Sequence, residues 1–416
     1  MKTSFPKSEM RVLLLEGVHD RAAELFGAEG FDVRREQGAL THDQLASRLD
    51  DVHLLGIRSK TQLEAAHVAG ASRLIGVGCF CIGTNQVDLR AACAAGIPVF
   101  NSPFSNTRSV AELTIAEIVA LHRRLADHVR RMHAGDWRKE SAGAHEVRGR
   151  TLGIVGYGHI GSQVSVLAEA LGMHVVYHDV LQRLPLGNAR PMRTLDDLLR
   201  ASDVVTLHVP ADASTRHLID ERAITRMRPG STLINNARGS VVDLPALASA
   251  LTSGHLAGAA IDVFPEEPEA SISAFSTALC GLPNVILTPH IGGSTCEAQE
   301  GIASDVATKL IRFVNNGSTT GAVNVPEVEL PEQAHDYADA EGDRPHRILH
   351  FHRNVPGVLG KMHALIAERG VNVSAEYLRT NESIGYVVLD VDPTDAAPVI
   401  DGLRAIPETI RLRVLW

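Results

Sequence analysis

The sequence predicts an α/β protein with two doubly wound parallel sheets and a small C-terminal βαββαβ domain. Short apolar runs alternate with helical patterns over about the first hundred residues, and again from residue 151 onward. This alternation is typical of parallel strands covered by helices on both faces. The end of the chain reads differently, as strand, helix, strand, strand, helix, strand, which is the order of a ferredoxin-like unit.

The first domain is expected to begin with five strands and four helices. A long amphipathic pattern follows at about residues 108–133 and predicts a helix that leaves this domain. The expected strands are residues 11–15, 31–35, 53–57, 73–79 and 97–101, and the helical patterns between them are 21–30, 41–51, 61–68 and 88–96.

A second alternating set predicts the second domain, at residues 106–294. A further helical pattern at 295–316 is expected to return the chain to the first domain, which would then comprise 1–105 and 295–326. Two long connecting helices suit a hinge between two domains. The expected strands of the second set are residues 151–158, 174–179, 203–209, 231–235, 258–263 and 284–290.

An acidic segment at 327–344 predicts a solvated linker to a terminal domain at 345–416. Residues 327–343 carry seven acidic side chains and no basic ones. The expected elements of the terminal domain are the strands 347–353, 371–380, 385–392 and 409–416 and the helices 357–370 and 396–406.

Composition restricts the class of protein. With 44% hydrophobic and 21% charged residues, the 416-residue chain suits a globular protein of two or three domains. The net charge of −9 argues against nucleic acid as a partner, and it requires local cations for any anionic substrate. The first apolar run, Val12–Leu15, is too short for a signal peptide or a membrane span. Five cysteines without CxxC spacing favour reduced thiols, so we expect a cytoplasmic protein with no membrane partner.

A glycine-rich turn follows the first strand of the second set. Gly156, Gly158 and Gly161 form a GxGxxG pattern between a strand and a helix, the context in which this pattern binds the pyrophosphate of a dinucleotide. The second domain is therefore predicted to be Rossmann-like. Asp179 ends the next strand and would accept hydrogen bonds from the adenine ribose, which favours NAD over NADP. A glycine-rich turn without a ligand is the alternative.

Three segments of the second domain, 235–243, 261–268 and 288–294, resemble the catalytic blocks of the D-2-hydroxyacid dehydrogenases. The resemblance continues through 56–61 and 81–88 to the last strand. Within the family it indicates the bacterial group that carries a C-terminal ACT domain. That group oxidises 3-phospho-D-glycerate to 3-phosphohydroxypyruvate, the first step of L-serine biosynthesis, as a homotetramer.

Elementary chemistry supports the same catalytic residues. Oxidation of a secondary alcohol needs a base for the hydroxyl proton, and the imidazole of His290 titrates near neutrality. Glu267 would hold the imidazole and stabilise its charged form, and Arg238 would grip the substrate carboxylate. This scheme needs no metal. Taken singly, each could instead be a loop or surface residue.

The cofactor and substrate sites extend beyond these three residues. Arg58, Ser59 and Lys60 follow a predicted strand, where two cations and a hydroxyl would hold a phosphate, although a solvated turn is the alternative. The family pattern adds Ile82, Gly83 and Asn106 on the substrate side. It gives these positions toward the nucleotide: Gly156, Gly158, His159, Ile160, Gly161, Asp179, Asn236, Ala237, Arg238, Asp262, His290, Ile291, Gly292 and Gly293.

The ACT-like domain is expected to bind L-serine as an inhibitor between two chains. His352, Asn354 and Asn372 match the serine-contacting positions of the family, although the two asparagines could merely cap a turn and a strand.

Two other functions of the whole protein remain open. One is oxidation of another 2-hydroxy acid, such as glycerate or 2-hydroxyglutarate. The other is a non-catalytic NAD-sensing corepressor, which the presence of Arg238, Glu267 and His290 disfavours.

Overall fold

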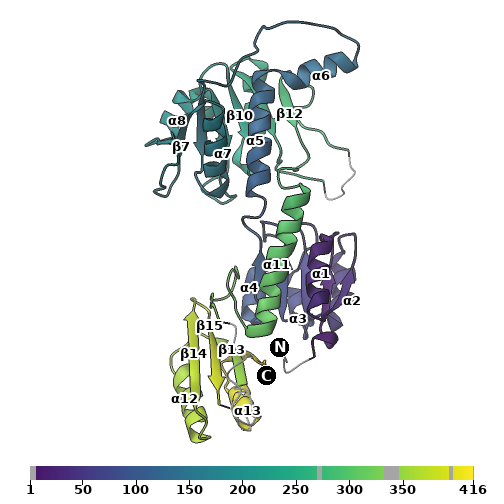
Figure 1. Cartoon of the computed structure of the whole chain (residues 1–416), viewed down its shortest axis with the longest axis vertical. Helices are drawn as coiled ribbons and strands as arrows, with labels where there is room; N and C mark the ends of the chain where they lie inside the picture. The colour runs from purple at the N-terminus through teal and green to yellow at the C-terminus, as the bar shows by residue number, and fades with distance from the viewer. Residues whose placement is uncertain (1–5, 269–273, 332–345, 393–396, 416) are drawn as a thin grey trace. The chain divides into compact units, whose positions relative to one another are not determined.

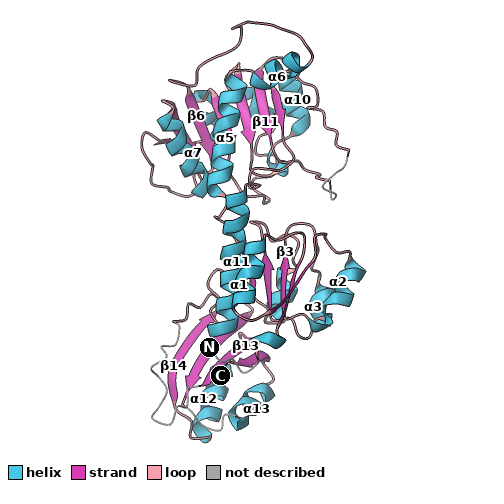
Figure 2. Cartoon of the chain, turned by 45° about the vertical axis from the view of Figure 1, so that its right-hand side comes forward, coloured by secondary structure: helices cyan, strands magenta, loops and turns pink. Residues whose placement is uncertain are grey.

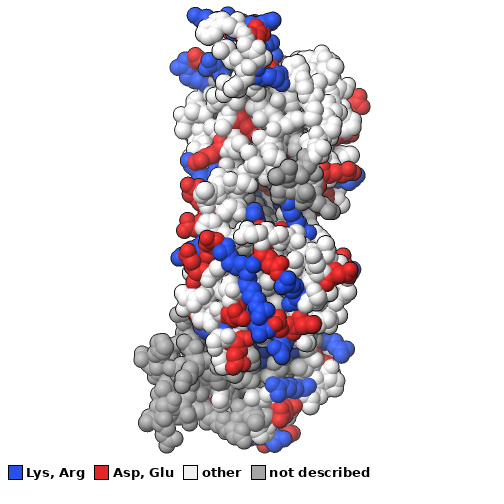
Figure 3. Space-filling model, turned by 90° about the vertical axis from the view of Figure 1, so that its right-hand side faces the viewer, with Lys and Arg blue, Asp and Glu red and all other residues white. Residues whose placement is uncertain are grey.

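The computed structural model describes residues 6–268, 274–331, 346–392 and 397–415. The chain forms two compact units, residues 1–105 with 299–416 and residues 106–298. Among the described helices, none is long and apolar enough to cross a membrane. On the face drawn in Figure 3, acidic and basic side chains are interspersed.

The first unit contains a five-stranded parallel sheet in the order β2-β1-β3-β4-β5. Strands β3 and β4 are buried along their whole length, as expected of strands with helices on both faces. The strands are β1 Arg11–Leu14, β2 Asp32–Arg35, β3 Leu54–Ile57, β4 Gly76–Cys79 and β5 Val99–Asn101, and the helices are α1 Asp20–Ala28, α2 His42–Arg48, α3 Ala65–Gly70 and α4 Leu89–Ala94.

Helix α11, Cys296–Asn316, packs on this sheet at very close range. A Cβ atom added at Gly78 of β4 would lie 2.6 Å from Val306 Cγ1, so the glycine allows the helix to approach. Leu310 and Phe313 of the helix are buried in the same hydrophobic cluster as the strand residue Leu14. Residues 299–316 are therefore part of the first unit's core.

The second unit contains a seven-stranded parallel sheet in the order β12-β11-β10-β9-β6-β7-β8. Figure 1 shows α5 and α7 side by side on one face of it. The strands are β6 Thr151–Val155, β7 His174–His178, β8 Arg190–Pro191, β9 Val204–Leu207, β10 Ser231–Asn235, β11 Leu256–Ile261 and β12 Val285–Leu287. The helices are α5 Thr107–His122, α6 Leu125–His133, α7 His159–Ala170, α8 Leu195–Ala201, α9 Glu221–Arg226 and α10 Leu244–Thr252.

Two elements of this unit differ from the prediction. The stretch expected as one helix at 108–133 is two helices, because Arg124 between them adopts a left-handed conformation with φ 49°. The two-residue strand β8 at the sheet edge was not expected, and a strand this short leaves no periodic pattern in the sequence.

The C-terminal residues form a four-stranded antiparallel sheet in the order β14-β15-β13-β16. Figure 2 shows helices α12 and α13 together on one side of it. The elements are β13 His346–Arg353, α12 Val358–Glu368, β14 Val373–Thr380, β15 Ile384–Val391, α13 Ala397–Ala405 and β16 Thr409–Val414. The predicted fold class, two doubly wound sheets and a ferredoxin-like unit, is confirmed.

The two central strands of this sheet, β13 and β15, are buried against the rest of the first unit on the face that lacks helices. Leu349 and Tyr386 belong to the same hydrophobic cluster as α11, and the Tyr386 hydroxyl donates to the Gly317 carbonyl at 2.6 Å. Val328 and Leu330 are buried in this cluster too, so the segment predicted as a solvated linker is packed at its start. Residues 332–345 of that segment lie outside the described residues.

Candidate active site

The glycine turn between β6 and α7 has room for a ligand at one glycine and at neither of the others. At Gly156, with φ +90°, an added Cβ would lie 2.4 Å from the His208 carbonyl oxygen. At Gly161 it would lie 2.2 Å from the Gly156 oxygen, which shows how closely helix and strand pack. At Gly158 nothing lies within 4 Å, so the backbone is accessible there. This pattern fits a pyrophosphate at the start of α7, where His159 and Ile160 are the first helical residues.

Asp179 lies directly after β7 with its carboxylate fixed beside this turn. One oxygen accepts from the Tyr157 N–H and the other from the Leu181 N–H, both at 2.8 Å. Its side chain is 10% exposed, and the Arg183 guanidinium approaches within 3.7 Å. Asp179 therefore lies at the strand end where the acidic residue of a dinucleotide site is expected.

His290 and Glu267 form a hydrogen-bonded pair. The His290 Nδ1 lies 2.8 Å from Glu267 Oε2, and Glu267 Oε1 accepts from the Phe264 N–H at 3.2 Å. The hydrogen bond to Glu267 and the charge of that carboxylate raise the pKa of His290 above its usual value, against the effect of burial. Burial alone would raise the pKa of Glu267, but the hydrogen bond from His290 and its positive charge lower it overall.

Arg238 lies in a turn that is held by hydrogen bonds between its own residues. The Asn235 side chain accepts from the Ala237 N–H at 3.1 Å and donates to the Arg238 carbonyl at 3.0 Å. The Arg238 guanidinium donates to the Ala237 carbonyl at 2.7 Å. Its positive charge partly opposes the rise in the pKa of His290 and contributes to the lowering of the pKa of Glu267. The three groups therefore lie close enough to act on one another.

Asp262 holds the loop that follows His290. Its carboxylate accepts from the Ile291 and Gly292 N–H groups at 2.8 Å and from the Thr288 hydroxyl at 2.6 Å. The Gly293 backbone passes close to Asn106, since an added Cβ would lie 2.5 Å from the Asn106 amide nitrogen. The second unit thus brings Asn106 to the His290 loop.

The other predicted substrate residues belong to the first unit. Arg58, Ser59 and Lys60 follow β3, while Ile82 and Gly83 follow its parallel neighbour β4. Because carboxyl ends of parallel strands meet at one edge of a sheet, both loops lie at that edge. Arg58 is half-buried, whereas Ser59 and Lys60 are exposed. Asn106 and Arg238 belong to the second unit, whereas these two loops belong to the first.

Glu16 is a residue of this site that the sequence analysis missed. Its carboxylate accepts from the backbone N–H groups of Arg58 at 3.2 Å, Lys60 at 3.0 Å and Thr61 at 2.8 Å. Glu16 is 9% exposed and adopts φ 60°, rare for a residue with a side chain. An acidic residue directly after the first buried strand was the available signal.

The predicted effector residues lie at opposite ends of the C-terminal sheet. Asn354 follows β13 and donates to the Asn381 carbonyl at 2.7 Å, whereas Asn372 precedes β14 and donates to Asp392 at 3.1 Å. His352 is buried over Gly385, and its Nδ1 has no hydrogen-bond partner among the described residues. Strands of eight residues separate the two ends by about 25 Å. One chain therefore does not bring the two asparagines together.

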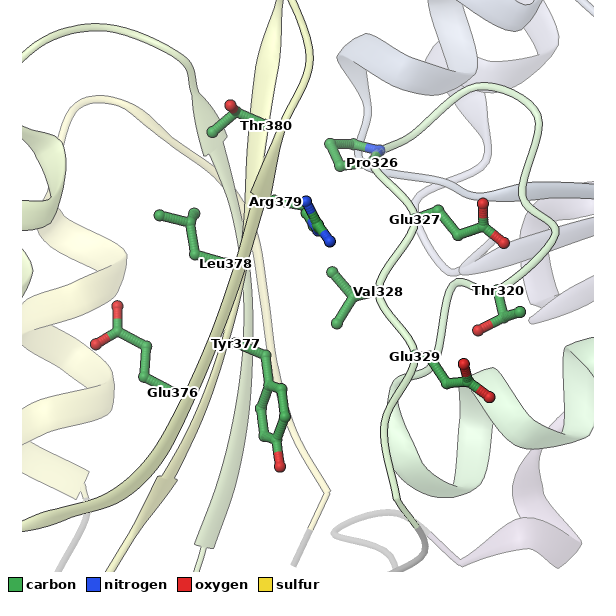
Figure 4. A pocket seen from close by; sticks show the side chains of 10 residues that line it. All are labelled: Thr320, Pro326, Glu327, Val328, Glu329, Glu376, Tyr377, Leu378, Arg379 and Thr380. Atoms are coloured by element: carbon green, nitrogen blue, oxygen red, sulfur yellow. The ribbon is translucent and has the colours of Figure 1, made fainter.

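A cavity of about 770 Å³ lies elsewhere, between β14 and the segment 320–329. In Figure 4, Arg379 of β14 extends toward Val328 and Tyr377 lies on the same side of the strand, whereas Glu376 and Leu378 lie on the other side. None of the three predicted effector residues is among its lining residues.

One group among the described residues has metal-ligand character. Single ligand atoms of His42, Glu64 and His67 lie within 4.8 Å of one another. The His67 ring is already engaged, because Nδ1 accepts from the Glu64 N–H at 3.1 Å and Nε2 lies 3.0 Å from the His42 carbonyl. We assign no metal to this group, and a reaction without metal stays a prediction.

Two family models match the chain. Residues 115–292 match the D-isomer specific 2-hydroxyacid dehydrogenase, NAD binding domain, and residues 348–411 match the AHAS small subunit-like ACT domain. NAD is therefore the cofactor of the second unit, in agreement with the accessible backbone at Gly158.

Curated relatives match from end to end. The chain is 50% identical to D-3-phosphoglycerate dehydrogenase of Escherichia coli strain K12, covering 100% of both chains. It is 49% identical to the enzyme of the same name from Dictyostelium discoideum, covering 100% of this chain and 99% of the relative.

Solved structures agree on the fold. The TT0316 protein of Thermus thermophilus aligns with a TM-score of 0.70 at 32% identity, over 76% of this chain and 100% of the other. D-lactate dehydrogenase from Aquifex aeolicus, complexed with NAD and lactic acid, aligns with a TM-score of 0.65 at 29% identity, over 74% and 96%.

Proposed function

The chain belongs to the D-isomer specific 2-hydroxyacid dehydrogenase family, and from this premise we propose that it oxidises 3-phospho-D-glycerate to 3-phosphohydroxypyruvate with NAD. It is an NAD-dependent oxidoreductase, and its full-length relatives are named for this substrate. The observation that carries the chemistry is the 2.8 Å contact between His290 and Glu267, in the same unit as the glycine turn.

His290 is the base of the proposed mechanism. A carboxylate only accepts, so the Glu267 contact keeps the proton on Nδ1 and leaves Nε2 as the atom that takes the hydroxyl proton. Glu267 then stabilises the imidazolium that forms, as the raised pKa of His290 indicates. NAD, when bound, supplies the hydride acceptor.

Arg238 holds the substrate carboxylate in this proposal. Its guanidinium presents a planar fork that matches a carboxylate, and the braced turn fixes its position. Asn236 and Ala237 precede it, and Asp262 supports the run from His290 to Gly293, so the two segments proposed to line the nicotinamide are both fixed by hydrogen bonds.

The proposed phosphate site is the loop of Arg58, Ser59 and Lys60, with Ile82 and Gly83 beside it. Two cations at one loop would supply the local positive charge that a chain of net charge −9 needs for an anionic substrate. Asn106, close to the His290 loop, completes the proposed set of substrate contacts.

The experiment that tests the substrate compares three 2-oxo acids in an NADH-oxidation assay. We expect kcat/KM for 3-phosphohydroxypyruvate to exceed that for hydroxypyruvate by about tenfold or more, the effect of a charge-assisted contact. The third acid, 2-oxoglutarate, tests the alternative of a 2-hydroxyglutarate dehydrogenase. Equal efficiency with and without the phosphate would refute the assignment.

We propose that L-serine inhibits the enzyme by binding between the ACT domains of two chains. The separation of Asn354 from Asn372 within one chain supports a shared site, because one serine is far too small to reach both. Titration of L-serine against wild type, Asn354→Ala and Asn372→Ala tests the site. Inhibition that survives both substitutions would reject it. The proposed assembly is a homotetramer in the cytoplasm, and light scattering tests its size.

A further inference from the structure

A buried glutamate on helix α5 contacts the turn that carries Arg238. Glu117 is 3% exposed, and the Asn236 side-chain amide donates to its Oε2 at 2.7 Å. The same amide donates to the Thr114 hydroxyl at 3.1 Å, and that hydroxyl donates onward to the Val110 carbonyl at 2.9 Å. Both N–H groups of the Asn236 side-chain amide therefore donate to side chains of helix α5.

The remaining oxygens of this pair lack a donor. Glu117 Oε1 and Asn236 Oδ1 are both buried, and neither has a hydrogen-bond partner in the described part of the chain. A buried acceptor without a donor costs about 1–3 kcal/mol. Two such atoms on contacting side chains would be satisfied together by one proton, carried by Glu117 and donated to Asn236 Oδ1.

The electrostatic environment favours that proton. Burial raises the pKa of Glu117 to about 7, against the hydrogen bond from Asn236, and the negative charge of Asp262 raises it further. Asp262 is the titratable group whose charge acts on Glu117 from the elements packed against α5. Its carboxylate is committed to the Ile291 and Gly292 N–H groups. An ionised Glu117 would repel the carboxylate that holds the His290 loop.

We infer that Glu117 is a positioning residue that, in its protonated form below neutral pH, pairs with the Asn236 carboxamide through two hydrogen bonds and so fixes the turn that presents Arg238. The inference rests on the proposed role of Arg238. The turn is sensitive to displacement, because a Cβ added at Gly239 would lie 2.0 Å from the Phe264 carbonyl carbon. Release of Asn236 would shift the Arg238 guanidinium relative to His290.

Substitution by glutamine distinguishes this role from that of an ionised carboxylate. The glutamine amide can donate to Asn236 Oδ1 and accept from Asn236 Nδ2, which reproduces the protonated acid. Glu117→Gln should therefore keep kcat and KM within about threefold of wild type. Glu117→Ala removes the Glu117 partner of Asn236, leaving only the bond to Thr114, and should lower kcat/KM by about tenfold or more. The matched control is Glu112→Gln, an exposed glutamate of the same helix paired with Arg108.

Two readouts on the full-length enzyme need no substrate. The infrared difference spectrum between wild type and Glu117→Gln should contain the carbonyl stretch of a protonated carboxyl group at about pH 6, below the pKa of Glu117. Because the folded pKa lies above the ordinary value of 4.5, wild-type stability should fall as pH rises toward about 7. Glu117→Gln should not lose this stability. The difference between its melting temperature and that of wild type should therefore change in favour of the variant as pH rises.

An ionised-carboxylate band at about pH 6 overturns the inference, and so does a Glu117→Gln variant as impaired as Glu117→Ala. If wild type reduces no 2-oxo acid, the proposed function fails, while the infrared and melting experiments still decide the protonation of Glu117. Glu117→Gln thus serves as the test even if Glu117→Ala folds poorly.

Discussion

Each unit carries an arginine on a loop at the carboxyl ends of its parallel strands, and each loop is held by a buried glutamate. Behind Arg58, Glu16 accepts three backbone N–H groups. Behind Arg238, Glu117 contacts a side-chain amide that offers both a donor and an acceptor. The same residue type therefore supports the two loops through different partners, backbone donors in one and a carboxamide in the other.

The strongest test of what the Arg238 loop serves is removal of the base beside it. His290→Ala should lower kcat by about two orders of magnitude or more, the usual contribution of general acid–base catalysis. NADH should still bind, since the glycine turn is unchanged. Stopped-flow and fluorescence titration measure the two quantities. Near-normal turnover would show that His290 is not the catalytic base, and the Arg238 loop would then have no assigned role in the reaction.

Removal of Arg58 tests the other loop. Arg58→Ala should reduce the preference for 3-phosphohydroxypyruvate over hydroxypyruvate by about ten- to a hundredfold, the range of a lost charge-assisted hydrogen bond. Activity on the unphosphorylated acid should change little, because Arg238 is in the other unit. A loss equal for both acids would assign Arg58 a role in folding rather than in phosphate recognition.

The difference between the two supporting glutamates is tested by replacing each of them with glutamine. Glu16→Gln places an amide N–H₂ against backbone donors, so KM for the phosphorylated acid should rise by about tenfold. Glu117→Gln should leave KM within about threefold, for the reason given above. Steady-state kinetics and melting curves on the two variants measure the difference. If both variants behave alike, the difference in hydrogen-bond partners does not distinguish the two glutamates.

The sequence predicted the fold well, because parallel strands and the glycine turn leave local patterns, and the proposed catalytic residues were found in the same way. Buried strands such as β3 are continuous apolar runs, and the glycine turn has its strand and helix directly on either side. Arg238, Glu267 and His290 lie in short segments with recognisable composition. The helix break at Arg124 had no such signal, since neither glycine nor proline marks it.

The hydrogen bonds of the supporting glutamates could not be predicted, because their partners are remote in sequence. Glu117 contacts a residue 119 positions away, and Glu16 contacts N–H groups 42 to 45 positions away. On α5, Glu117 is an acidic residue in an amphipathic helix, where a solvated face is the ordinary interpretation. Only the fold shows that this position faces the Asn236 turn.

The smallest expected effect concerns Glu267, the exposed counterpart of Glu117. Its hydrogen bond and charge raise the pKa of His290. Alcohol oxidation needs neutral His290, so the rate falls as pH drops through that pKa. Glu267→Gln removes the charge but keeps an acceptor, which lowers the pKa of His290. The acid limb of the pH–rate profile for 3-phosphoglycerate oxidation should then move to lower pH. Glu117→Gln removes no charge at pH values below the pKa of about 7 of Glu117, so it should leave the acid limb in place. A shift to higher pH in the Glu267 variant, or an equal shift in both, would mean that another group controls the limb.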